Sequence, residues 1–409
     1  MKSTCSGVNV TYQSAMAAPP RIRAIRTGSL RQRGRPARSW LGGRARPPGP
    51  IRCVVVAGSA LPSAGARSGR EAVRLQVGRA EQERHVELGQ SGRGAVRGTA
   101  PWRGGGRWLR WFAMPEYSER FFRSGTLRIH FRDWGDPTKP PLVIVHGLRD
   151  HSHSFDELAR GLVDRFHVLA LDLRGHGDSE TTPYYHFGHF VLDLHNLVRA
   201  LRLEKPVIFG HSMGGEIVAT YAGCFPGVPE RLVIVEGLGP PLPTMDEEIA
   251  WTIAGFGRID QAMSGQRGID DLEAAYRRMR ERNPRLTERQ ARELALLGTR
   301  AREDGKLEWK FDAMLSTMAL NGPFNLEYAM AFWKRVAAPT LILHGAESGE
   351  FWRSKPGAIY LDPDDLQRRL GCFRAVRFVE IPGAGHMVHF DRPRELLAEV
   401  RAFLDTPEA

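Results

Sequence analysis

The chain from about residue 117 onward alternates short apolar runs with amphipathic stretches. LRIHFRDWG (127–135) alternates apolar and polar positions, which predicts a strand ending in the turn Gly135-Asp136-Pro137. Six further runs are continuously apolar, as is typical of strands buried on both faces of a sheet. These runs are PLVIVHG (141–147), HVLALDLRGHG (167–177), EKPVIFGHS (204–212), ERLVIVEG (230–237), APTLILHG (338–345) and RAVRFVEIPGAGH (374–386).

Between most of these runs the apolar positions recur at helical spacing. Helices are predicted over 155–162, 190–203, 213–224 and 394–404. Strands that alternate with helices favour an α/β fold, with a mostly parallel sheet covered on both faces. The interval 237–338 has no strand-like run and is charged and helix-prone, so we expect a helical cap over the strand ends rather than a long loop.

Charge divides the chain sharply. Residues 1–113 hold 20 Arg, one Lys and four Glu, a net charge of +17, which leaves −5 on the remainder of a chain whose total is +12. This leader is rich in Arg, Gly, Pro and Ser without hydrophobic periodicity, so we expect it to be disordered. It is interpreted as an upstream region translated before a start at Met114, as an organelle transit peptide, or as a nucleic-acid-binding tail.

The predicted organisation is therefore a leader (1–113), a first core part (114–236), a helical cap (237–338) and a second core part (339–409). No run reaches the ~18 apolar residues of a membrane span. The four cysteines form no CxxC motif, which argues against a zinc or disulfide framework. We expect no metal, no cofactor, no nucleic acid on the folded part, and a cytoplasmic location, with organelle targeting as the alternative.

The segment Gly210-His211-Ser212-Met213-Gly214 joins a predicted strand to a predicted helix. A sharp turn there exposes the serine hydroxyl, and only small neighbours tolerate such a backbone. The backbone N–H of Met213 opens the helix and is oriented to stabilise a developing negative charge. Ser212 is thus the candidate nucleophile, although a serine that merely caps the helix would give the same local pattern.

Two loops supply candidate partners for this serine. The N–H of Leu148, after His146-Gly147, is the second candidate oxyanion donor, whereas His146 itself is expected to stabilise the turn. His386 follows a strand and a glycine-rich loop, so it is the candidate general base, with His389 as the alternative.

Four motifs in order resemble the α/β-hydrolase superfamily: His146-Gly147, Leu171–Ser179 (LDLRGHGDS), the serine segment, and GAGHMVHFDRP (383–393). The resemblance covers roughly residues 120 to 406. It implies the α/β-hydrolase fold, a structural role for the turn at Asp172, and a cap domain over 237–338. It does not specify a substrate.

The family's usual acid follows the strand PTLILHG in a Gly-x-x-Asp turn, but this chain has Ser348 there. Glu236 ends the preceding strand, RLVIV, and some related hydrolases carry their acid after that strand. We therefore predict Glu236 as the acid of a Ser–His–acid triad. The alternatives are Glu347, Glu350, Asp364 or no acid.

A serine nucleophile favours acyl transfer through an acyl-enzyme. The predicted function is hydrolysis of a carboxylic ester, or a related acyl bond, of a largely apolar small molecule. Alternatives are lactone or C–C bond hydrolysis on the same triad, and an inactive ligand-binding or scaffold protein. Candidate substrate-binding residues are Arg149, Trp251, Trp309 and Trp333, although most such aromatic residues lie in cores.

Overall fold

The computed structural model describes residues 53–57, 117–240, 244–321, 325–353 and 362–406. Its centre is a nine-stranded sheet. The strands are β1 (Cys53–Ala57), β2 (Tyr117–Ser124), β3 (Leu127–Trp134), β4 (Pro141–Val145), β5 (His167–Leu171), β6 (Val207–His211), β7 (Arg231–Val235), β10 (Thr340–Gly345) and β11 (Ala375–Ile381). Their order across the sheet is β1-β11-β10-β7-β6-β4-β5-β3-β2.

The six strands from β11 to β5 run parallel, and β1, β2 and β3 join the edges antiparallel. The predicted α/β class and the seven predicted strands are confirmed. A parallel sheet is stable when helices cover both faces, and its strands are then apolar throughout. All five residues are buried in each of β5, β6 and β7, which explains why these runs lack alternation.

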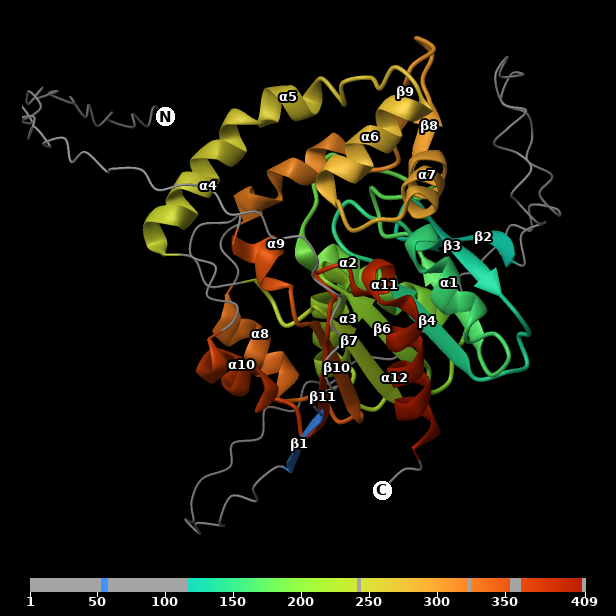
Figure 1. Ribbon diagram of the computed structural model, residues 1–409, viewed down its shortest axis with the longest axis vertical. Coiled ribbons are helices and arrows are strands. Elements are labelled where there is room, and N and C mark those ends of the chain that lie inside the picture. The colour runs from blue at the N-terminus through green and yellow to red at the C-terminus, as the bar shows by residue number, and fades with distance from the viewer. Residues whose placement is uncertain (1–52, 58–116, 241–243, 322–324, 354–361, 407–409) are drawn as a thin grey trace, which may run out of the picture. The chain divides into compact units, whose positions relative to one another are not determined.

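Helices form a layer on each face of this sheet (Figure 1). One apolar cluster includes residues of α2 (Phe187–Ala200), α3 (Met213–Cys224), α8 (Leu326–Trp333) and α10 (Pro363–Leu370). A second cluster on the opposite face includes residues of α1 (Asp156–Arg160), α11 (Val388–Asp391) and α12 (Pro393–Asp405). The prediction for 213–224 is confirmed to the residue, and 190–203 differs from α2 by three residues at each end.

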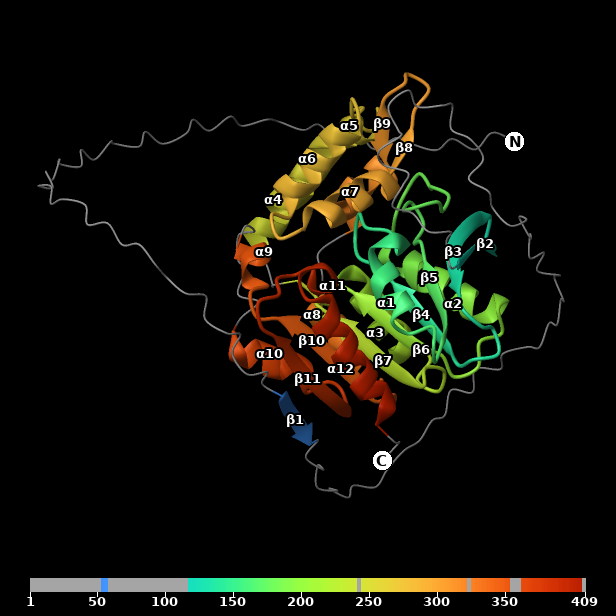
Figure 2. The same cartoon turned by 45° about the vertical axis from the view of Figure 1, so that its right-hand side comes forward.

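The segment between β7 and α8 forms a cap over the strand ends (Figure 2). It contains α4 (Met245–Gly257), α5 (Ile259–Met263), α6 (Leu272–Arg282), α7 (Glu288–Leu297) and the 3₁₀ helix η4 (Ala313–Asn321). The expectation that 237–338 holds no strand is wrong, because β8 (Thr299–Ala301) pairs antiparallel with β9 (Leu307–Trp309). Strands of three residues are too short to produce a detectable hydrophobic pattern. At the other end of the segment, α8 packs against α3 of the core.

Two further strands were absent from the sequence-based expectation. β2 forms a hairpin with β3 through the turn at Gly125, whose φ is +64°. β1 lies inside the Arg-rich leader and pairs with the free edge of β11. The expected disorder is therefore wrong for Cys53–Ala57, where a β-branched run meets an unpaired strand edge. The rest of the leader lies outside the described residues, so its disorder stays a prediction.

Candidate active site

The nucleophile candidate sits in a tight turn between β6 and α3. Ser212 has φ +54° and ψ −123°, a backbone conformation that L-residues adopt only where the surrounding structure enforces it. Its backbone N–H donates to the carbonyl oxygen of Val235 on the neighbouring strand, at 2.9 Å. The turn projects the hydroxyl beyond the carboxyl end of the sheet, where ligands of α/β folds bind.

The two glycines of the motif are required by close backbone approach. A Cβ atom on Gly210 would lie 2.4 Å from the carbonyl oxygen of Gly214, and one on Gly214 would lie 2.3 Å from that of Val145. Both distances are far below van der Waals contact. The sequence pattern around Ser212 therefore has a steric cause that is independent of the serine's chemistry.

His386 is the histidine that contacts the serine. Its Nε2 lies 3.0 Å from Ser212 Oγ, and its Nδ1 lies 3.1 Å from Oε2 of Glu236. The loop between β11 and α11 carries His386 across the sheet to these two strand ends. The ring is buried, and Phe351 of α9 (Gly349–Arg353) stacks on it with ring centroids 4.1 Å apart. The structure thus brings Ser212, His386 and Glu236 together in one chain of contacts.

Glu236 is buried directly after β7 and also has a positive φ, +56°. Its Oε1 accepts a hydrogen bond from the backbone N–H of Gly345 at 2.6 Å, and its Oε2 accepts one from Ser348 Oγ at 2.5 Å. Burial raises the pKa of Glu236 to about 7, and His344 with these two hydrogen bonds opposes the rise. Ser348, at the family's usual acid position, thus donates a hydrogen bond to the carboxylate of Glu236.

The other candidate carboxylates lie at the surface, and two of them pair with an arginine. Glu347 and Glu350 are exposed at the surface and both pair with Arg285 of the cap. Asp364 is exposed in the first turn of α10. Of these four carboxylates, Glu236 is the one that lies within hydrogen-bond distance of His386.

The two expected oxyanion donors lie on the loops predicted for them. Met213 is the first residue of α3, so its N–H has no acceptor within the helix. Within the described part of the chain, neither this N–H nor that of Leu148 donates to another protein group. His146 stabilises the loop, because its Nε2 accepts from the N–H of Leu173 at 3.0 Å.

Asp172 and His389 also hold structural positions. Asp172 accepts from the backbone N–H of Ser152 at 2.7 Å and pairs with His130 at 2.7 Å, which fixes the loops beside the site. The ring of His389 is buried, stacks on Phe155, and lies edge-on to His211. Burial lowers the pKa of His211 to about 3 and holds that of His389 well below its usual value, so both rings are neutral at pH 7.

The four candidate substrate-binding residues lie in different environments. Arg149 follows the oxyanion loop, and its guanidinium lies 5.8 Å from the ring centroid of Phe311 in the cap. Trp309 of β9 is half-buried and stacks on Phe311, while Trp251 is exposed on α4. Trp333, the last residue of α8, is fully buried in the core and stacks on Phe373, so the prediction that it binds substrate is wrong. Trp333 falls inside the predicted cap (237–338), and its sequence position gave no signal that α8 packs against α3 of the core.

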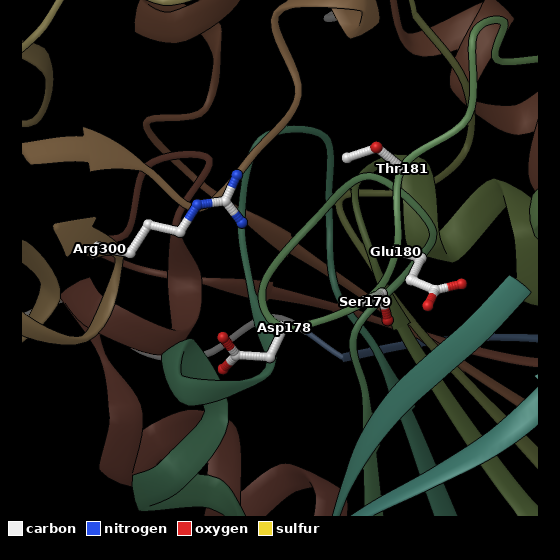
Figure 3. Close-up of a pocket in the computed structure, with 5 residues that line it drawn as sticks. All are labelled: Asp178, Ser179, Glu180, Thr181 and Arg300. Atoms are coloured by element: carbon white, nitrogen blue, oxygen red, sulfur yellow. The ribbon is translucent and has the colours of Figure 1, made fainter. Parts of the chain in front are cut away.

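A surface pocket elsewhere is lined by Asp178, Ser179, Glu180, Thr181 and Arg300 (Figure 3). Its charged groups are already paired within the protein. Asp178 binds Lys310 at 2.8 Å, Glu180 accepts from the backbone N–H of Arg128, and Arg300 pairs with Glu308. None of the triad candidates lines this pocket, so it is separate from the site at Ser212.

The fold and the geometry at Ser212 define a class that comparison with known proteins identifies. Residues 142–400 match the model of the Alpha/beta hydrolase family, and the chain belongs to this family. It is a hydrolase. Among the described residues, no helix is long and apolar enough to span a membrane.

Two relatives and one solved structure illustrate what the chain is similar to. The chain is 30% identical over 275 residues to the sn-1-specific diacylglycerol lipase ABHD11 of Danio rerio, covering 66% of this chain and 79% of the relative. It is 29% identical to the 3-hydroxybutyrate-oligomer hydrolase of Cupriavidus necator, covering 67% of this chain and 92% of the relative. Among solved structures, E-2-(acetamidomethylene)succinate hydrolase aligns with a TM-score of 0.59 at 24% identity, covering 71% of this chain and 100% of that chain, which shows the fold alone.

Proposed function

We propose that the chain is a serine hydrolase that cleaves a carboxylic ester through an acyl-enzyme. The observation that carries this proposal is the unbroken contact chain from Ser212 Oγ to His386 Nε2, at 3.0 Å, and from His386 Nδ1 to Glu236, at 3.1 Å. A base within hydrogen-bond reach of a serine, itself oriented by a buried carboxylate, is the arrangement that activates a hydroxyl for attack.

The proposed reaction has two halves. His386 Nε2 accepts the proton as Ser212 Oγ attacks the ester carbonyl carbon, and the N–H groups of Leu148 and Met213 stabilise the oxyanion. His386 then returns the proton to the leaving alcohol, which leaves an acyl group on the serine. In the second half His386 deprotonates a water molecule, whose oxygen attacks the acyl carbon. The bond to Ser212 Oγ then breaks, the acid is released, and His386 returns the proton to Ser212 Oγ, while Glu236 stabilises the imidazolium in both halves.

The relatives support an ester rather than another substrate of the fold. A diacylglycerol lipase and a hydrolase of 3-hydroxybutyrate oligomers both act on carboxylic esters, and the two share about 30% identity with this chain. The half-buried aromatic pair Trp309 and Phe311 in the cap supports a largely apolar acyl or alcohol group. Hydrolysis of lactones and of C–C bonds would use the same triad, so a lactone and a substrate with a cleavable C–C bond are tested as alternatives to the ester.

One observation favours a second candidate, an ester that also carries a free carboxylate. Burial, followed by the charges of Arg282 and Arg258 in the cap, lowers the pKa of Arg149. Among the described residues, none of these three guanidinium groups pairs with a carboxylate. Like charges that act on one another without a carboxylate partner favour an anionic ligand, and a hydroxy-acid oligomer ends in such a group.

A labelling experiment tests the ester hydrolase proposal directly. A fluorophosphonate probe should label wild-type protein on Ser212, as located by peptide mass spectrometry, and should not label Ser212→Ala. Hydrolysis of p-nitrophenyl esters of graded chain length should fall by about 10⁴-fold or more in Ser212→Ala, because the nucleophile is lost. Ser264→Ala, at an exposed cap serine, is the matched control and should keep both properties.

The outcome also separates the alternatives. A Ser212→Ala variant that keeps its fold and more than a tenth of the esterase activity would overturn the proposal. For the second candidate, Arg149→Gln should raise KM about tenfold for a 3-hydroxybutyrate dimer and leave KM unchanged for its methyl ester. Equal effects on both esters would show that Arg149 does not recognise the carboxylate.

A further inference from the structure

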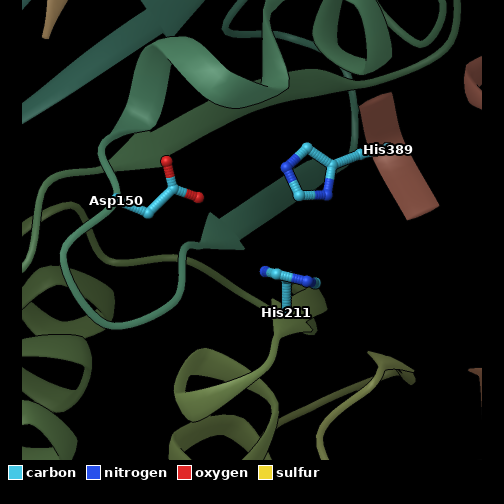
Figure 4. A group of neighbouring side chains, drawn as sticks. All are labelled: Asp150, His211 and His389. Carbon is cyan, nitrogen blue, oxygen red and sulfur yellow. The ribbon is translucent and has the colours of Figure 1, made fainter. Parts of the chain in front are cut away.

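Behind the triad, three side chains from three different segments converge (Figure 4). Asp150 lies in the loop after β4, His211 ends β6, and His389 lies in α11. Each offers one ligand atom, and these atoms all lie within 4.8 Å of one another. The triad does not use any of the three side chains, and the sequence separates them by up to about 240 residues.

The facing atoms are buried without hydrogen-bond partners. Asp150 Oδ2, His211 Nδ1 and both ring nitrogens of His389 make no hydrogen bond to the described part of the protein. His211 and His389 are buried, with 2% and 4% of their residue surface exposed. Buried polar atoms are nearly always satisfied, so a group of them facing one another requires something between them.

The tautomer of His211 indicates what kind of ligand could lie between these three side chains. Its Nε2 donates to the backbone carbonyl oxygen of His386 at 2.9 Å, and a carbonyl can only accept. The proton of this neutral ring is therefore on Nε2, and Nδ1 presents a lone pair. A ring N–H bound to a carbonyl while the other nitrogen faces inward is the usual outer contact of a metal-binding histidine. Asp150 is held in the same way, because its Oδ1 accepts from Ser154 Oγ.

We propose that Asp150, His211 and His389 bind one divalent first-row transition metal ion, with Zn²⁺ as the probe. Two imidazole nitrogens and one carboxylate oxygen suit such an ion and do not suit Ca²⁺ or Mg²⁺, which require oxygen ligands. Zinc bonds of about 2.0–2.1 Å in tetrahedral geometry would bring the ligand atoms to roughly 3.3 Å apart, so the three side chains would move together from separations of up to 4.8 Å.

The ion would join the three segments that carry the proposed catalytic groups. Asp150 is two residues after Leu148, His211 directly precedes Ser212, and His389 is three residues after His386. The ion would not contact the substrate, and it would hold these loops in register from behind. This role extends the proposed function but does not depend on it, because binding is measured without hydrolysis.

A second group of similar composition shows why the missing partners matter. His130, Asp172 and Asp178 also lie close enough to offer ligand atoms within 4.8 Å. Both ring nitrogens of His130 are already bonded, however, to Asp172 and to Glu119. That group is a satisfied hydrogen-bond network and has no lone pair to offer from the ring.

The test measures metal on the full chain. Protein stripped with a chelator should take up one equivalent of Zn²⁺ by mass spectrometric metal analysis, and its Tm should rise with Zn²⁺. Co²⁺ should give the visible absorption of a low-coordinate ion with nitrogen ligands. His389→Phe and Asp150→Asn should weaken binding by about 100-fold or more, because each removes a ligand. His195→Phe is the matched control, since His195 also stacks on a phenylalanine, Phe225, outside the cluster.

Asp150→Asn keeps the size of the side chain, so it remains informative if His389→Phe fails to fold. Equal Zn²⁺ affinity in wild type, Asp150→Asn and His195→Phe would place any bound zinc elsewhere and overturn the proposal. Absence of Zn²⁺ and Co²⁺ uptake at 100 μM by folded wild type, about a hundred times a micromolar Kd, would show that the three groups enclose water only.

Discussion

The neighbouring strands β7 and β10 differ in what their ends contribute near His386. Glu236 directly follows β7, and its carboxylate contacts His386; Ser348 follows β10, and its hydroxyl donates to that carboxylate. In the parallel register Val235 lies opposite Leu343, so both strand ends open at the same edge of the sheet. In the family's usual arrangement the acid stands at the Ser348 position, after β10. The acid proposed here, Glu236, follows the adjacent strand β7 instead.

From this difference we expect that the histidine requires a buried carboxylate rather than a particular strand. A carboxylate from either strand end lies near the side of His386 that faces away from Ser212. The strand that does not supply the acid still contributes, because a buried carboxylate needs hydrogen-bond donors to remain charged. Ser348 and the N–H of Gly345 supply these donors to Glu236 from β10 and the turn after it.

Breaking the acid at β7 should have the largest effect. Glu236→Gln keeps the side-chain shape and removes the charge that stabilises the imidazolium, so kcat for a p-nitrophenyl ester should fall about 10⁴-fold. Glu347→Gln, at an exposed glutamate one residue from Ser348, is the control and should stay within about twofold of wild type. A crippled Glu347→Gln beside a near-normal Glu236→Gln would reverse the assignment.

Moving the acid to β10 sharpens the same comparison. Glu236→Ala combined with Ser348→Asp returns the carboxylate to the family's usual position. The double variant should recover about 10- to 100-fold in kcat over Glu236→Ala alone, because charge again faces His386. Steady-state kinetics of both variants, with circular dichroism as a check of folding, decide the result. No recovery in a folded double variant would mean that the two strand ends are not equivalent.

Ser348→Ala should shift the pH dependence. Burial raises the pKa of Glu236 to about 7, so kcat/KM should fall as the carboxylate becomes protonated below pH 7. Ser348 donates to the charged form and lowers this pKa, so its removal raises the pKa. The acid limb of kcat/KM should therefore move to higher pH by about one unit. Glu350→Gln should leave the limb in place, and an unchanged limb in Ser348→Ala would contradict the role given to Ser348.

Shortening the leader should have the smallest effect. A chain that starts at Met114 lacks β1, which pairs with the outer edge of β11. The loop with His386 follows β11, whose other edge stays paired with β10. We expect kcat to stay within about twofold and Tm to fall by a few degrees at most, measured on purified proteins. A larger drop in Tm would show that the leader contributes substantially to the folded domain.

Sequence by itself determined the features that depend on near neighbours. The apolar runs predicted the parallel sheet because each strand is buried along its whole length. Gly210 and Gly214 identified the turn at Ser212 because backbone crowding there excludes any Cβ. A charge directly after an apolar strand identified Glu236, since such a group is costly unless it has a partner.

Tertiary structure decided the features that join distant segments. The donation from Ser348 to Glu236 spans 112 positions, and no local pattern signals it. The same holds for Trp333 in the core, for β1 on the edge of β11, and for the meeting of His211 with His389. Each depends on strand register and on which face a helix turns inward. Strand register and helix orientation are fixed by packing across the whole domain, so no short stretch of the chain determines them.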